Sequence, residues 1–235
     1  HYELGEELKP LNAKGEAQVI GSNLSYPVVR SRRASLWLEL GFEYLDLWDE
    51  ANSIKTRDRE VAVGSLNLKG NFFDRFKGGG LTIAEMTFYG GNAHLSGLAS
   101  NRMADAAGPG THGGFSRLTY SMARLQRITQ AAALFVSMRG QLASGNLDSS
   151  QKFILGGPYG VRAYPSGEGA GDEGHMGTVE IRYDLPPIPY LKSTQLIGFY
   201  DAGWTKLNND PWPGAIINAT GKNDYVLSSG GIGLN

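Results

Sequence analysis

The feature that most constrains this chain is a long alternation between apolar and polar residues. In Ser35–Asp46 every second residue is apolar, namely Leu36, Leu38, Leu40, Phe42 and Tyr44. The positions between them include Glu39, Gly41 and Glu43. Successive side chains on a β-strand point to opposite faces, so this stretch predicts a strand with one apolar and one polar face.

The same pattern recurs along the chain. In Thr129–Ser144 the apolar set is Ala132, Leu134, Val136, Met138 and Leu142, and the polar set is Ser137, Arg139 and Gln141. In Thr178–Leu185, Val179, Ile181 and Tyr183 alternate with Glu180, Arg182 and Asp184. Weaker candidates are Ala17–Val29, Arg59–Asp74, Gly79–Leu95, Gly113–Ile128, Thr194–Lys206, Tyr225–Asn235 and a strand near Tyr2–Leu8. We therefore expect about ten strands joined by glycine-rich connections.

The predicted strands are long, and their polar faces carry charges in mid-strand. Several run for about ten residues, whereas strands of water-soluble proteins peak near five or six. No apolar run reaches the roughly 18 residues that a membrane helix needs, but a barrel strand needs only about 9–11 alternating residues. The sequence favours an all-β, transmembrane antiparallel β-barrel with a wet lumen over a β-sandwich binding module.

Signals for other classes of function are weak. The net charge is −1, and the chain has no cysteine and four histidines without metal-ligand spacing. The glycine-rich pieces do not match a phosphate-binding loop, and no GxSxG elbow occurs. We expect no enzyme activity, no cofactor, no metal site and no nucleic-acid partner.

The stretch Asn146–Met176 is too long for an ordinary hairpin turn. It carries apolar residues that a free loop would seldom carry: Phe153, Ile154, Leu155, Tyr159, Val161 and Tyr164. A loop folded into the lumen would bury them. Alternation in Thr194–Lys206 places Phe199, Asp201 and Gly203 on the polar face. Asp201 is therefore expected to face the lumen, where the loop could offer it Arg162.

These pieces resemble, in order, the motifs of the TpsB transporters, the haemolysin activation and secretion proteins of the BamA/TpsB superfamily. Arg162 lies in a VRAY tetrapeptide that resembles the family's VRGY loop motif, with Ala163 in place of glycine. Phe199, Asp201 and Gly203 resemble the FxDxG strand motif. The other matching pieces are Tyr26–Pro27 with Arg30, Gly140–Leu147, Gly167–Gly174, Glu180–Arg182 and Leu227–Leu234.

The resemblance implies a location in the bacterial outer membrane and transport of a large secreted partner to the cell surface without ATP. The partner would be a TpsA-type adhesin, haemolysin or toxin. The alternative is a BamA-type factor that assembles other outer-membrane proteins. By resemblance, the motif Val161, Arg162, Ala163 and Tyr164 is anchored by Phe199, Asp201 and Gly203. The pore wall would include Glu39, Glu43, Arg139, Glu180 and Arg182.

Family members have periplasmic POTRA domains and a sixteen-stranded barrel. With about ten strands, residues 1–235 are expected to form part of such a barrel, with an inserted lumen loop at 146–176. POTRA domains, early strands and final strands are expected to lie outside this sequence. The outer face of this barrel is expected to contact outer-membrane lipid.

Overall fold

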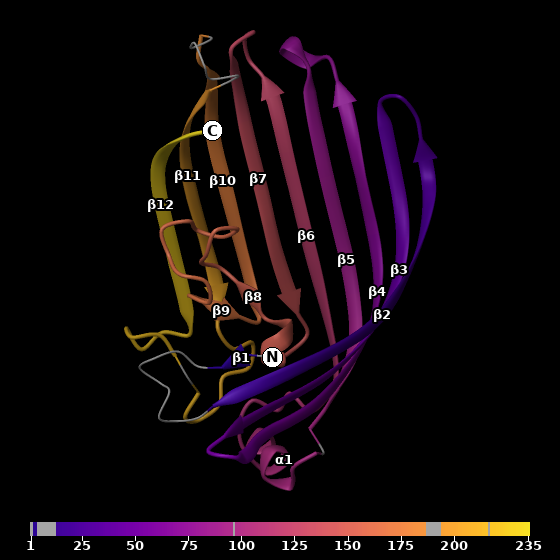
Figure 1. Cartoon of the computed structure of the whole chain (residues 1–235), viewed down its shortest axis with the longest axis vertical. Coiled ribbons are helices and arrows are strands. Elements are labelled where there is room, and N and C mark those ends of the chain that lie inside the picture. The colour runs from indigo at the N-terminus through magenta and orange to yellow at the C-terminus, as the bar shows by residue number, and fades with distance from the viewer. Residues whose placement is uncertain (1, 4–12, 96, 187–193, 216) are drawn as a thin grey trace.

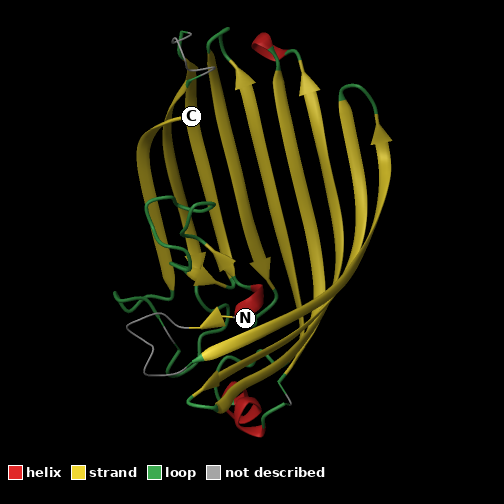
Figure 2. Ribbon diagram, in the orientation of Figure 1, coloured by secondary structure: helices red, strands yellow, loops and turns green. Residues whose placement is uncertain are grey.

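The computed structural model describes residues 2–3, 13–95, 97–186, 194–215 and 217–235. Ten strands form one antiparallel sheet in the order β1-β2-β3-β4-β5-β6-β7-β10-β11-β12 (Figure 1). Their bounds are β1 Tyr2–Glu3, β2 Lys14–Arg30, β3 Ala34–Ala51, β4 Ile54–Asp74, β5 Gly80–His94, β6 Gly113–Arg127, β7 Ala132–Ala143, β10 Glu173–Asp184, β11 Gln195–Lys206 and β12 Asp224–Leu234. Figure 2 shows the sheet curving around one concave side. The all-β barrel architecture predicted from the alternation is confirmed.

The remaining elements are short. A two-stranded ladder joins β8 (Phe153–Ile154) to β9 (Ala170–Gly171), and one α-helix, α1, covers Ala99–Ala106. Two single-turn 3-10 helices, η2 (Phe76–Gly78) and η3 (Ser149–Gln151), complete the described elements. No helix in the described residues is long and apolar enough to cross a membrane.

The pairing register places the apolar residues of neighbouring strands on the same, convex face. Leu40 lies opposite Leu66, which lies opposite Phe88 on the next strand. Leu40 is 53% exposed and Ile181 is 65% exposed. Side chains this large and apolar gain by leaving water, so a lipid environment explains their exposure on one continuous face. The faces predicted for Ser35–Asp46, Thr129–Ser144 and Thr178–Leu185 agree with this register.

The two ends of the sheet differ. At one end the connections 31–33, 75–79 and 128–131 are short. At the other end lie the connections 95–112, 144–172 and 207–223, whereas β3 and β4 join there through a tight turn at Asn52 and Ser53, both with positive φ. Barrels of the outer membrane have short periplasmic turns and longer extracellular loops. The long connections therefore mark the extracellular end.

Several boundaries differ from the sequence prediction; β3, for example, runs to Ala51 and β4 begins at Ile54. The strand expected from Thr129 begins at Ala132, because the Thr129 hydroxyl accepts hydrogen bonds from the amides of Ala131 and Ala132 and closes a turn. The loop expected to end at Met176 ends at Asp172, since Glu173–Met176 already pair with β11. Most of the strand expected near Tyr2–Leu8 lies outside the described residues. The part that is described, Tyr2–Glu3, pairs with β2.

Candidate functional site

The connection between β7 and β10 folds back onto the concave face of the sheet (Figure 1). Its middle is a compact turn, in which the Val161 amide donates to the Leu155 carbonyl at 2.8 Å and the Gly157 amide donates to the Tyr164 carbonyl at 3.0 Å. Gly160 is required here because a Cβ at this position would lie 2.1 Å from the Leu155 oxygen. Glycine permits this close approach of backbone to backbone. We call residues 144–172 the inserted loop.

Arg162 binds two carboxylates on the inner face of the sheet. Its Nε lies 2.8 Å from Oδ2 of Asp201, and its Nη2 lies 2.9 Å from Oδ1 of the same carboxylate. Its Nη1 lies 2.8 Å from Oε1 of Glu180 on the adjacent strand. The guanidinium also stacks over the Phe199 ring at 3.6 Å from the centroid. The predicted pairing of Arg162 with Asp201 therefore occurs in the structure, with Glu180 as a second partner.

The surroundings of this pair are well satisfied. Asp201 is fully buried and also accepts hydrogen bonds from the hydroxyls of Thr178 (2.8 Å) and Ser229 (3.3 Å). Glu180 in turn binds Arg182 at 2.6 Å, so two carboxylates balance two guanidinium groups. Hydrogen bonding to Asp201 raises the pKa of Arg162, and the bond to Glu180 adds to this against the opposing effect of burial. We call Arg162, Asp201, Glu180 and Arg182 the charge network.

Each residue of the Phe199, Asp201 and Gly203 motif has a separate contact with the inserted loop. Phe199 lies under the guanidinium, and Asp201 binds its nitrogen atoms. Gly203 leaves room for Leu155, since a Cβ there would lie 2.5 Å from Leu155 Cδ1 and 2.7 Å from the His175 oxygen. The spacing of two puts all three residues on one face of β11. The motif is thus a docking surface for the loop.

An apolar cluster lies between the loop and the wall. Leu155 and Val161 are fully buried and pack with Phe153, Met176 and Leu227. Tyr164 is partly buried against the same cluster. Two of the expected residues are not buried, because Ile154 is 47% exposed and Tyr159 is 91% exposed. The loop therefore turns one apolar face to the wall and presents Tyr159 to the lumen.

A second set of contacts fixes the stem of the loop, and sequence reasoning missed it. Asp172 is fully buried, although carboxylates in loops are usually solvated. It accepts from the amides of Leu147 (3.0 Å) and Asn209 (2.7 Å), and its Oδ1 lies 2.7 Å from Lys152 Nζ. Its position in the Gly167–Gly174 motif was the available signal. Asp172 joins the start of the loop, its end and the next extracellular connection.

The other predicted site residues fall into two groups. Arg139 faces the lumen but binds the loop, donating to the Ile154 carbonyl at 2.9 Å and stacking over Phe153. Arg182, which belongs to the charge network, also stacks over Phe135. Glu39 and Glu43 lie on β3, away from the loop, and Glu39 pairs with Lys69 at 2.8 Å. Ala163 is exposed and is not among the residues with positive φ, so replacement of glycine causes no strain there.

A curved antiparallel sheet that is apolar outside, polar inside and holds a loop against its inner wall defines an outer-membrane β-barrel with an inserted lumen loop. The family model of the haemolysin secretion/activation proteins ShlB/FhaC/HecB matches residues 1–223. The chain belongs to this family, which places it in the bacterial outer membrane. The match does not favour the barrel-assembly alternative.

Relatives and solved structures agree with this assignment. The heme/hemopexin transporter protein HuxB of Haemophilus influenzae is 27% identical over the whole chain. This chain spans 40% of the length of that relative. The structural match with CdiB from Escherichia coli covers 95% of this chain and 40% of the CdiB chain, with TM-score 0.73 and 16% identity. The match with CdiB from Acinetobacter baumannii covers 94% of this chain and 36% of that CdiB chain, with TM-score 0.66 and 18% identity. At such identities, these two structures establish the fold.

Proposed function

We propose that the protein containing these residues is a protein-conducting pore of two-partner secretion. It would pass one large secreted partner from the periplasm to the cell surface without ATP. The observation that carries this proposal is the inserted loop, held on the lumen wall by Arg162 through Asp201 and Glu180. A loop anchored by reversible polar contacts inside a polar lumen suits a passage that opens and closes.

The partner is proposed to be a TpsA-type protein, such as an adhesin, a haemolysin or a toxin. The family description refers to haemolysin secretion, and the HuxB relative is described as a heme/hemopexin transporter. These descriptions support a secreted partner and leave its type open within that class. The absence of catalytic activity stays a prediction, as do periplasmic POTRA domains and further strands outside this sequence.

In this proposal the charge network sets the position of the loop. Removing one member of a poorly solvated ion pair leaves its partner uncompensated and costs about 3–5 kcal/mol. The Arg162 side chain is 31% exposed, so we place the cost of losing it near the lower limit, about 3 kcal/mol. That is enough to shift the loop without unfolding a sheet of long strands. The pore wall would include Glu39, Glu43, Arg139, Glu180 and Arg182.

The proposal is tested by secretion from a Gram-negative host. The full-length parent protein is expressed with its candidate partner, and the partner is measured in the medium. Arg162→Ala and Asp201→Ala are compared with Asp184→Asn, which removes a carboxylate from the lumen face of β10 outside the charge network. Barrel levels are measured in the outer membrane. We expect secretion with the parent and with Asp184→Asn, and impaired secretion with the two network variants.

Two results would contradict parts of this proposal. A partner that stays in the periplasm beside a folded parent barrel would exclude two-partner secretion. If other outer-membrane proteins were lost at the same time, the protein would be an assembly factor. Secretion that survives both network substitutions would retain the pore and exclude the role of the charge network.

A further inference from the structure

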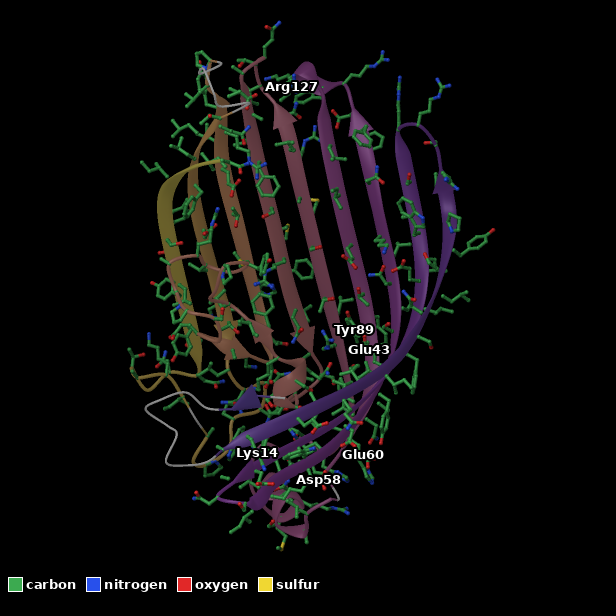
Figure 3. The ribbon with its side chains drawn as sticks, viewed as in Figure 1. Lys14, Glu43, Asp58, Glu60, Tyr89 and Arg127 are labelled. Atoms are coloured by element: carbon green, nitrogen blue, oxygen red, sulfur yellow. The ribbon has the colours of Figure 1, made fainter. Side chains whose placement is uncertain are left out.

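A hollow of about 330 Å³ lies in the lumen wall on β2–β5, away from the inserted loop. Its inner surface contains two glycines, Gly21 and Gly41, where other positions of the wall carry side chains. A Cβ on Gly41 would lie 2.4 Å from Ser65 Oγ. The hollow therefore exists because these strands have no side chain at its centre. Figure 3 labels Glu43 and Tyr89, which line it from β3 and β5.

Carboxylates predominate around this hollow. Glu39, Glu43 and Glu85 line it, and Glu39 is paired with Lys69. Glu43 and Glu85 make no ion pair within the described part of the chain, although Lys69, which lies opposite Glu85, attracts that carboxylate as well. A second cation, Arg117, attracts Glu43, stacks over Tyr89 at 3.7 Å and donates to Gln141 and Gln151. Three carboxylates thus face two cations, both of which are already engaged.

A buried amide oxygen in the same wall lacks a donor. Asn67 is 6% exposed and lines the hollow. Its Nδ2 donates to Glu85 Oε1 (2.7 Å) and Thr87 Oγ1 (2.6 Å), which uses both amide protons. Its Oδ1 has no hydrogen-bond partner among the residues that the structure describes. Buried polar atoms are rarely left unpaired, so this oxygen indicates a missing donor, and a group seated in the hollow would reach it once the Asn67 side chain turns.

The chemistry of the missing group follows from these acceptors. An N–H donor would satisfy Asn67, and a positive charge would be attracted by Glu43 and Glu85. A guanidinium or ammonium group meets both requirements. No cluster of three or more carboxylate or imidazole groups in the described residues is arranged to hold a metal ion. An organic cation is therefore the ligand that the wall fits.

The opposite wall reinforces this choice. Arg139, Arg162 and Arg182, on or against β7–β11, are each held over an aromatic ring. The two carboxylates near them, Glu180 and Asp201, are occupied by Arg162 and Arg182. Of these five charged groups only Arg139 lacks a balancing carboxylate, so a cation in the lumen is favoured beside the carboxylates of β3–β5 over this wall.

We propose that this hollow is a subsite for a basic side chain of a polypeptide passing through the lumen. This inference rests on the proposed secretion function and specifies the chemistry by which the pore holds its cargo. Arginine fits better than lysine, because its planar group presents several N–H donors to Asn67 and to the carboxylates of Glu43 and Glu85.

The test uses the full-length protein in planar lipid bilayers. The probes are the blocked peptide Gly-Ser-Arg-Ser-Gly and the same peptide with citrulline, which keeps the shape of arginine without its charge. The residence time of each peptide is read from interruptions of the ion current. We expect the parent protein to hold the arginine peptide about tenfold longer, as one charge-assisted contact of about 1.4 kcal/mol would give.

Variants locate the effect. Glu43→Gln and Glu85→Gln, singly and together, are expected to remove most of this tenfold difference, whereas Asp184→Asn should preserve it. Equal residence of the two peptides in the parent protein would overturn the subsite, and this comparison needs no variant to fold. Equal losses in Asp184→Asn and in the Glu43 and Glu85 variants would overturn it as well, because only the total lumen charge would then matter.

Secretion of the partner by the parent protein is measured in parallel. Secretion without peptide discrimination would leave the pore intact and contradict the subsite. Discrimination without secretion would support a cation subsite in a protein whose proposed function is wrong.

Discussion

At the scale of single residues, Arg162 contributes geometry as well as charge. Its planar group bridges Asp201 and Glu180, which lie on neighbouring strands, and covers the Phe199 ring. A lysine ammonium is a compact charge on a flexible stem and cannot make this set of contacts at once. A change that conserves charge is therefore not conservative at this position.

We expect Arg162→Lys to destabilise the barrel nearly as much as Arg162→Ala, by about 3 kcal/mol. The measurement is the temperature at which the full-length protein loses its compact, fast-migrating form on semi-native gels. Asp184→Asn serves as the control, since the Asp184 carboxylate lies outside the charge network and accepts a hydrogen bond from Gln195. A lysine variant with the melting behaviour of the parent would show that charge alone anchors the loop.

Asp148 gives a prediction about pH. It lies outside the main sheet, in the inserted loop, and binds Arg59 at 2.8 Å with both side chains nearly buried. Burial alone would raise its pKa, but the Arg59 charge and the bonds to Ser150 outweigh burial and lower the pKa. A free aspartate has a pKa of about 3.9. The contact is therefore fully stabilising above about pH 4 and is lost as the pH falls through the lowered value.

We expect amide hydrogen exchange at residues 147–152 to be independent of pH from 5 to 8, after correction for intrinsic rates, and to accelerate only below about pH 4. Asp148→Asn should exchange faster at every pH and lose the acid-dependent step. Acceleration that begins near pH 6 would assign the transition to another group.

At the scale of elements, β11 must accommodate the loop along its inner face. Gly203 and Gly198 lie on the same strand, but their surroundings differ. A Cβ at Gly203 would overlap Leu155 and the His175 backbone, whereas a Cβ at Gly198 would meet nothing within 4 Å. The pair separates loop docking from any general effect of adding a methyl group to β11.

We expect Gly203→Ala to cost about 1–3 kcal/mol by forcing the loop away from the wall, and Gly198→Ala to be nearly neutral. The melting temperature on semi-native gels reports the cost, and protease cleavage within 153–165 reports the position of the loop. Equal effects of the two substitutions would contradict the docking role of Gly203.

Alternation predicted the strands well because it reflects lipid on one side and water on the other. It placed Glu39, Glu180 and Asp201 on the inner face, where the register puts them. It misplaced strand boundaries where local hydrogen bonds determine the start of a strand, as at the Thr129 turn. The pairing of Arg162 with Asp201 was accessible from motif spacing. The burial of Asp172 could not be predicted from motif spacing. Its three partners are Leu147, Lys152 and Asn209, and only folding brings these residues together.

At the scale of the whole molecule, the strands are longer than the membrane requires. β4 has 21 residues and β3 has 18, whereas about 9–11 tilted residues cross the bilayer. Their extracellular ends pack around Val61 and Val63, both nearly fully buried. Together with α1 and the loop stem, these ends form an ordered extracellular rim (Figure 1). A partner leaving the lumen would pass this rim last.

The central claim is that a secreted protein passes along the concave face of this sheet. A photoreactive amino acid replaces Ser121 or Met122 in the full-length protein, because these neighbours are both exposed and lie on opposite faces of β6. Irradiation during secretion is expected to join the partner to position 121 and not to position 122. Secretion of the partner without an adduct at position 121, or adducts there with other barrel proteins in place of the partner, would contradict the claim.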